Sequence, residues 1–107
     1  MNRFVGNWKI IEMEQWDQEY IDLVQPGYFQ FSQDGSGEFV FGTVNGFLDC
    51  RHDDKKDPKK VEFSWEGTSE YDPVCGRGWL EIVEADQIQG MLFFHNGDES
   101  WVKGIKR

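Results

Sequence analysis

The chain has 107 residues, a formal net charge of −9 and two cysteines. This length predicts one domain over residues 1–107 with an ordinary hydrophobic core. The negative charge argues against nucleic acid as a partner, because nucleic-acid affinity depends on Lys and Arg that neutralise phosphates, and against anionic membrane surfaces. No apolar run reaches the roughly 20 residues of a membrane-spanning helix, and the first residues do not read as a secretory signal. We therefore expect a cytoplasmic protein with reduced thiols.

The N-terminal part predicts a strand followed by a helix. Apolar and polar residues alternate over residues 4–13, which is the period of a half-buried strand. Over residues 14–24 the period changes, since Trp16, Tyr20 and Leu23 are spaced as on one face of a helix. A Pro-Gly pair follows and ends this pattern. We therefore expect a short amphipathic helix between the first and second strands.

The next part predicts three strands with phenylalanines at alternate positions. These strands are expected over residues 28–32, 37–44 and 47–52. Asn45-Gly46 is a strong signal for a two-residue hairpin turn between the last two. If residues 42–46 form a bulge instead, these two strands merge and the total falls by one.

The second half predicts a long polar loop between strands. A loop of mixed charge over residues 53–60 leads to a strand at residues 61–66. Residues 67–78 then read as a loop, because glycines and polar side chains interrupt the apolar alternation. Three more strands with short turns are expected over residues 77–84, 88–95 and 99–106.

Together these elements predict an all-β protein. Eight short strands joined mostly by hairpins, with one short helix after the first strand, favour a single antiparallel up-and-down eight-stranded β-barrel. Closure of the barrel would also remove exposed sheet edges. A flattened sandwich and an open, strongly bent sheet are the alternatives.

The interior of such a barrel is just wide enough for side chains or for one small ligand. The residues expected to point inward are Trp8, Ile10, Phe29, Phe31, Phe39, Phe41, Val61, Phe63, Trp65 and Leu80. Aromatic residues make up 16% of the chain, which can either fill the interior or form a narrow apolar slot for a flat ligand. The two interpretations are a plugged barrel and a filled lower half with a small pocket at one mouth.

The predicted loop over residues 67–78 is the candidate frame for that mouth. Its neighbourhood holds the residues that we expect to contact a small, partly apolar ligand: Trp65, Glu66, Tyr71, Arg77 and Trp79. Arg77 stands between two glycines, and its planar guanidinium suits a carboxylate or phosphate. The competing interpretation is that Arg77 pairs with Glu66, or with a carboxylate within the loop, and only braces the loop.

A small barrel enzyme is a further alternative. In that case Glu66 and Tyr71 would perform acid–base chemistry while Arg77 orients an anionic group. No phosphate-binding loop, dinucleotide fingerprint or hydrolase motif occurs, so no cofactor is predicted.

Metal binding is weakly indicated. The soft-ligand residues are Cys50, His52, Cys75 and His95, and only Cys50 and His52 are close in sequence. Without a C-x-x-C pair, the pattern favours isolated thiols and ordinary histidines, and no metal site is predicted.

The charge distribution supports a different class of function. No Lys or Arg occurs from residue 10 to residue 50, and the acidic residues of this stretch cluster around residues 12–22. An acidic face can steer a basic protein into contact. An immunity- or inhibitor-like module that neutralises a basic toxin or nuclease is therefore the second functional hypothesis, and a homodimer is left open.

Short motifs also resemble a known superfamily. Gly6-Asn7-Trp8 resembles the Gly-x-Trp of the lipocalin and avidin (calycin) barrels. That resemblance implies that Trp8 closes one barrel end against a basic side chain, which would be Lys103, Lys106 or Arg107. A resemblance to a family of small, functionally uncharacterised bacterial β-barrel proteins rests on residues 41–46, 63–67, 76–79 and 94–98. Neither resemblance assigns ligand residues here.

Overall fold

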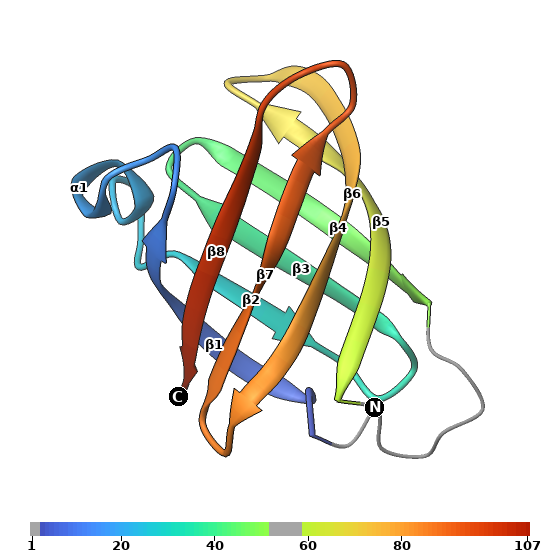
Figure 1. Cartoon of the computed structure of the whole chain (residues 1–107). Helices are drawn as coiled ribbons and strands as arrows, with labels where there is room; N and C mark the ends of the chain where they lie inside the picture. Colours follow the sequence, from blue (N-terminus) through green and yellow to red (C-terminus); the bar gives the residue numbers. More distant parts are fainter. Residues whose placement is uncertain (1–2, 52–58) are drawn as a thin grey trace.

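The computed structural model describes residues 3–51 and 59–107, which form a closed barrel (Figure 1). Every strand pairs antiparallel with the next strand in the chain, and β8 pairs with β1 to close the sheet. The predicted eight-stranded up-and-down barrel, with one short helix after the first strand, is therefore confirmed.

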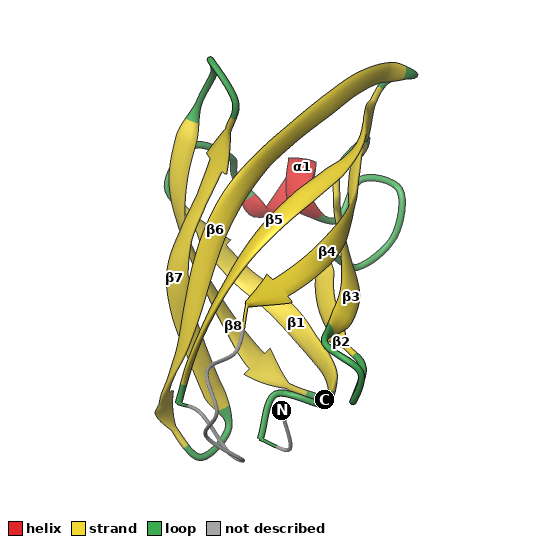
Figure 2. Cartoon of the chain, turned by 90° about the vertical axis from the view of Figure 1, so that its right-hand side faces the viewer, coloured by secondary structure: helices red, strands yellow, loops and turns green. Residues whose placement is uncertain are grey.

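The elements follow one another in the order that the alternation predicts, with several shifted boundaries. They are β1 (Gly6–Met13), α1 (Gln18–Ile21), β2 (Tyr28–Phe31), β3 (Ser36–Phe41), β4 (Val44–Arg51), β5 (Lys60–Ser69), β6 (Asp72–Glu84), β7 (Gln87–Phe94) and β8 (Glu99–Lys106). The chain termini and the β6–β7 turn lie at one end of the barrel, and α1 and the β5–β6 turn lie toward the other (Figure 2).

The interior is filled with aromatic rings. All of the residues expected to point inward are buried, with exposed fractions of 3% or less. Phe39 contacts three other rings, with ring centroids 5.3 Å from Phe29, 5.8 Å from Phe41 and 4.9 Å from Trp65. Apolar burial on this scale is the main favourable term in folding.

Small residues opposite large ones let these rings fit. Across neighbouring strands Phe39 pairs with Gly46, and Trp65 pairs with Gly76. A Cβ atom at Gly46 would lie 2.4 Å from the Phe39 ring, so any larger residue there would displace it. Interiors of small barrels often alternate large and small side chains in this way.

Both ends of the barrel are closed by side chains. At the end that holds the termini, Lys106 Nζ lies 4.6 Å from the centre of the Trp8 ring and donates a hydrogen bond to the Val5 carbonyl. Of Lys103, Lys106 and Arg107, Lys106 is the one whose amino group lies over the Trp8 ring. At the other end Trp16 covers the interior, 4.8 Å from Phe41 and 5.9 Å from Phe94 between ring centroids.

The predicted hairpin turn at Asn45-Gly46 is wrong. The turn lies at Gly42-Thr43, because Phe41 pairs with Val44 and the next pairs continue from there. Gly42 has a φ of 56°, a conformation that glycine adopts without steric cost, and a Cβ atom there would meet the Tyr20 ring at 2.2 Å. Gly46 makes room for the Phe39 ring, which approaches it closely inside the barrel, and the chain does not turn there.

The predicted long loop over residues 67–78 is also wrong. β5 continues to Ser69 and β6 begins at Asp72, so only Glu70 and Tyr71 turn between them. Gly76 and Gly78 interrupt the apolar pattern where the inward Trp65 and Phe63 rings take the space of a side chain, and Gly67 does so where it lies against the backbone of β4. Glu70 and Tyr71 have φ values of 50° and 77°, as a two-residue hairpin turn of type I′ requires.

The helix is shorter than the periodicity over residues 14–24 predicts. Asp17 caps it by accepting a hydrogen bond from the Tyr20 amide at 2.9 Å, and Ile21 is its buried residue. Trp16 instead covers the barrel end, and Leu23 lies exposed beyond the helix.

Most of the expected charged loop, and His52, lie outside the described residues. The described part of the chain contains no helix long and apolar enough to cross a membrane.

Candidate functional site

The structure does not bring the five predicted ligand residues to one mouth. Trp65 points into the barrel and is 3% exposed, whereas Glu66, Arg77 and Trp79 lie on its outer surface. Tyr71 stands at the tip of the β5–β6 hairpin with its side chain 99% exposed. The mouth near α1 is occupied by the rings of Trp16 and its neighbours. The hollows described below lie outside the barrel.

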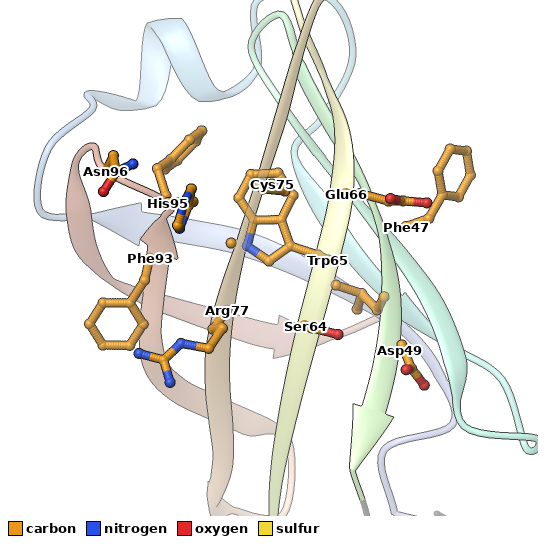
Figure 3. A pocket seen from close by; sticks show the side chains of 13 residues that line it. Phe47, Asp49, Ser64, Trp65, Glu66, Cys75, Arg77, Phe93, His95 and Asn96 are labelled. Carbon is orange, nitrogen blue, oxygen red and sulfur yellow. The ribbon is translucent and has the colours of Figure 1, made fainter.

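Arg77 belongs to a groove on the outer face of β4, β5, β6 and β7. The groove has a volume of about 770 Å³ and runs between two phenylalanines, Phe47 on β4 and Phe93 on β7. Figure 3 shows Phe93, Arg77 and His95 on one side of it and Phe47 with Glu66 on the other.

Strand register explains why the surface is hollow there. One row of outward side chains crosses the sheet in the order Asp49, Ser64, Arg77 and Phe93. The neighbouring row crosses as Phe47, Glu66 and Cys75, and the Cys75 carbonyl accepts a hydrogen bond from the His95 amide at 2.8 Å. Small Ser64 and Cys75 therefore lie between bulkier side chains, which form the walls.

The groove continues in both directions along β5 and β6. Toward the hairpin tip it meets a hollow lined by Thr68 and Pro73, which shares Phe47, Glu66 and His95 with it. Toward the other end it meets a hollow lined by Trp79, which shares Arg77 and Phe93. Four of the five predicted ligand residues (Trp65, Glu66, Arg77 and Trp79) thus line one continuous surface.

The guanidinium of Arg77 is free to meet a ligand. Among the described residues it forms no ion pair, so the interpretation that it braces the hairpin is not supported. Arg51 on β4 behaves differently, because its guanidinium lies 2.8 Å from the Asp49 carboxylate. An unpaired Arg beside an apolar wall is well suited to bind a carboxylate through two parallel hydrogen bonds.

The charges of the groove are separated across its width. Arg77 belongs to the wall made by β6 and β7, and Asp49 and Glu66 belong to the wall made by β4 and β5. A ligand with one anionic group would place that group toward Arg77 and keep it away from the carboxylates. A second anionic group would approach those carboxylates and be repelled.

The indole of Trp65 is the buried feature nearest the groove. Its Nε1 has no hydrogen-bond acceptor among the described residues, and a Cβ atom at Gly76 would lie only 2.9 Å from it. The ring makes perpendicular contacts with Phe39 at 4.9 Å and with Phe94 at 5.0 Å between centroids. Such contacts add to the burial of the ring and fix its orientation behind the groove.

The residues of the enzyme alternative are not assembled. Tyr71 and Arg77 are six residues apart along an extended strand, which corresponds to about 20 Å. Both side chains are exposed, and Tyr71 projects from the hairpin tip. A joint acid–base role needs groups within hydrogen-bond reach of one substrate atom, and this trio does not meet that condition.

The two thiols lie on opposite faces of the barrel wall. Cys50 is buried inside and Cys75 is exposed outside, and neither forms a disulfide. Of the soft-ligand residues, Cys50 is therefore separated from Cys75 and His95, and no group of three metal-ligating side chains occurs in the described ranges.

Burial makes the two thiols chemically different. Desolvation, with smaller contributions from Asp49 and Asp34, raises the pKa of Cys50 from 9.0 to about 12. We expect only Cys75 to react rapidly with a thiol reagent at pH 8, and Cys50 to react only after denaturation. Because unfolding lets Cys50 ionise near pH 9, its contribution to stability should fall as pH rises above 9. The reactivity prediction would be wrong if the folded Cys75→Ala variant still contained one thiol that reacts rapidly with the reagent.

The sequence did not indicate the walls of the groove. Phe47 and Phe93 are ordinary strand residues by pattern, and their placement on either side of the groove depends on the register of four strands. Of the groove residues, the sequence singled out Trp65, Glu66 and Arg77, the last because it stands between two glycines. The function of this groove has to be argued from its geometry, since no protein-family model, no curated protein and no solved structure matches the chain.

Proposed function

We propose that this chain is a non-catalytic binding protein for a small, partly apolar ligand that carries one carboxylate. The ligand lies in the outer groove of β4–β7, not inside the barrel. The observation that carries this proposal is the Arg77 guanidinium, which has no ion pair among the described residues and stands beside Phe93 in register. Closed barrel ends and a filled interior support the outer location.

The side chains of the groove walls explain why a partly apolar carboxylate would fit there. An apolar ring or short chain would lie against Phe47 and Phe93 while its carboxylate binds Arg77. Binding sites for small molecules typically combine apolar walls with few polar groups that fix orientation. The carboxylates of Asp49 and Glu66 favour a monoanion over a dianion of the same shape.

Binding can be tested with native mass spectrometry and isothermal titration calorimetry on a set of aryl and medium-chain carboxylates and their neutral amides. We expect at least one carboxylate to bind and its amide to bind more weakly. Arg77→Gln should weaken that binding about 10- to 100-fold, because hydrogen bonds to charged groups contribute about 1.5–3 kcal/mol.

Arg51→Gln is the matched control, since it removes the same charge from β4, two strands away from Arg77, where Asp49 already pairs with it. Equal losses of affinity in the two variants would mean that Arg77 acts only through the net charge of the protein. Undiminished binding by Arg77→Gln would refute the assignment of the groove.

Two broader proposals accompany this function. The contact between Lys106 and Trp8 supports a relation to the calycin barrels, because it reproduces the end closure that the Gly-x-Trp resemblance implies. A cytoplasmic location agrees with two free thiols, one of them exposed. Sulfhydryl labelling in intact cells of the native source would test the location.

A further inference from the structure

A second surface lies at the end of the barrel near α1, next to the hollow into which the groove continues. The longest two strands, β5 and β6, extend there as a hairpin whose turn projects beyond the neighbouring strands (Figure 2). Tyr71 occupies this turn with its side chain 99% exposed. In the described ranges no ring contact or hydrogen bond involves the Tyr71 side chain. The fold therefore does not use this aromatic group.

Other exposed apolar side chains border the same hollow. Val24 and Tyr71 line a depression of about 600 Å³ between the segment after α1, the β3–β4 turn and the hairpin tip. Val24 is 65% exposed and the preceding Leu23 is 60% exposed. Exposed apolar residues gathered at one place mark interaction sites more often than scattered ones do.

The backbone holds these groups in position. The Thr43 hydroxyl lies 3.1 Å from the Tyr20 hydroxyl, and the Gly42 amide donates to the Ile21 carbonyl at 2.9 Å, which ties the β3–β4 turn to α1. The Glu70 amide donates to the Thr43 carbonyl at 3.4 Å, which ties the hairpin tip to the same turn. The depression is thus framed by connected segments.

The charge around this depression has one sign. Every residue that lines it falls within residues 10–50 or 61–76, and neither stretch contains a Lys or Arg. Glu70 lines the depression, Asp72 follows Tyr71 at the tip, and Glu19 lies exposed on α1. Hydrogen bonds from the Gln18 side chain and the Gly27 amide lower the pKa of Asp22, which keeps that carboxyl ionised.

We infer that this surface, defined by Leu23, Val24, Glu70, Tyr71 and Asp72, docks a basic, partly apolar segment of a partner protein. Tyr71 is the anchor, because tyrosine supplies a large contact area with few rotatable bonds. The carboxylates select Lys- and Arg-bearing segments and speed their approach. This site shares none of its five residues with the Arg77 groove, so either proposal can fail without the other.

The test uses the full chain and defined peptide probes. The first probe is a fluorescent 12-residue peptide that alternates lysine with leucine, the second replaces each lysine by glutamate, and the third replaces each leucine by serine. Fluorescence anisotropy should show binding of the first probe, weaker binding of the serine probe and no binding of the glutamate probe. Tyr71→Ala and the double variant Leu23→Ser/Val24→Ser should each weaken binding of the first probe at least 5-fold. Neither variant changes the net charge of the protein.

A matched pair separates local from net charge. Glu70→Gln/Asp72→Asn and Glu84→Gln/Asp86→Asn remove the same two charges from the β5–β6 and β6–β7 turns, which lie at opposite ends of the barrel. The first pair should weaken lysine-probe binding at least 3-fold more than the second. Thermal unfolding of each variant confirms that it is folded.

Three results would overturn the inference. Equal effects of the two charge pairs would show that the lysine probe only senses net charge. Unchanged binding by Tyr71→Ala would remove the anchor. Sedimentation showing a dimer of the native chain that Tyr71→Ala dissociates would assign the surface to a second copy of this chain.

Discussion

Replacing Phe39 by alanine is expected to lower the free energy of unfolding by about 3–5 kcal/mol, the range for deleting a buried aromatic ring. The Phe39 side chain is fully buried and contacts three other rings at once. Gly46 stands opposite and offers no side chain to fill the space, so the cavity would persist. Domains of this size have a free energy of unfolding of about 5–15 kcal/mol, so this loss would be a large share of the total stability.

Phe47→Ala is the matched control for that experiment. Phe47 lies on the adjacent strand but points outward and is 62% exposed, so its loss should change stability by about 0.5 kcal/mol or less. Urea unfolding followed by tryptophan fluorescence measures both. A loss for Phe39→Ala as small as that for Phe47→Ala would mean that the interior is not close-packed.

Trp8→Ala is the second change with a large expected effect, again about 3–5 kcal/mol. Trp8 is 1% exposed, its Nε1 donates to the Phe4 carbonyl at 2.8 Å, and Lys106 lies over its ring. Its removal would leave that carbonyl without its donor, leave Lys106 without its ring and open the barrel end. The N-terminal and C-terminal strands would lose a shared contact.

Trp101→Ala provides the comparison, because this tryptophan also lies beneath a lysine but sits half-buried on the outer face. Lys103 Nζ is 5.1 Å from the Trp101 ring centre. The same denaturation experiment should show a loss for Trp101→Ala well below that for Trp8→Ala. Similar losses of unfolding free energy in the two variants would indicate that the cation–ring contact, and not closure of the barrel end, determines the contribution of Trp8 to stability.

The fold was largely predictable because alternation is a direct consequence of strand geometry. Inward positions such as Trp8, Phe29 and Phe63 were identified from the two-residue period alone. Short turns between the strands then favoured a meander, whereas closure was only favoured over a sandwich or an open sheet until the pairing of β8 with β1 showed it. The alternation and the short turns needed no information about contacts distant in sequence.

The turn and loop errors share one physical cause. Glycines at positions 46, 76 and 78 are typical of turns when read locally, but here each faces an aromatic ring on the adjacent strand. Their partners, Phe39, Trp65 and Phe63, are not their neighbours along the chain and meet them only through strand pairing. A rule based on neighbouring residues cannot distinguish a glycine that turns the chain from one that makes room for a ring.

The candidate site was predicted only in part for a related reason. Its residue types were identified and Trp65 was expected to face inward, but the predicted loop hid the fact that Arg77 lies on the neighbouring strand β6 and faces outward. The expected mouth also depended on a loop that is in fact strand. Once the register is known, Phe47 and Phe93 define the groove and the filled interior directs ligands to the outer face.

The most direct test of the account is a nuclear Overhauser experiment on the chain bound to an aryl carboxylate selected by the calorimetric screen. We expect intermolecular contacts from the ligand ring to Phe47 and Phe93, and shifts of the Arg77 side-chain resonances. Contacts from the ligand to Phe29 or Phe63 inside the barrel would contradict it, because they require a hollow interior.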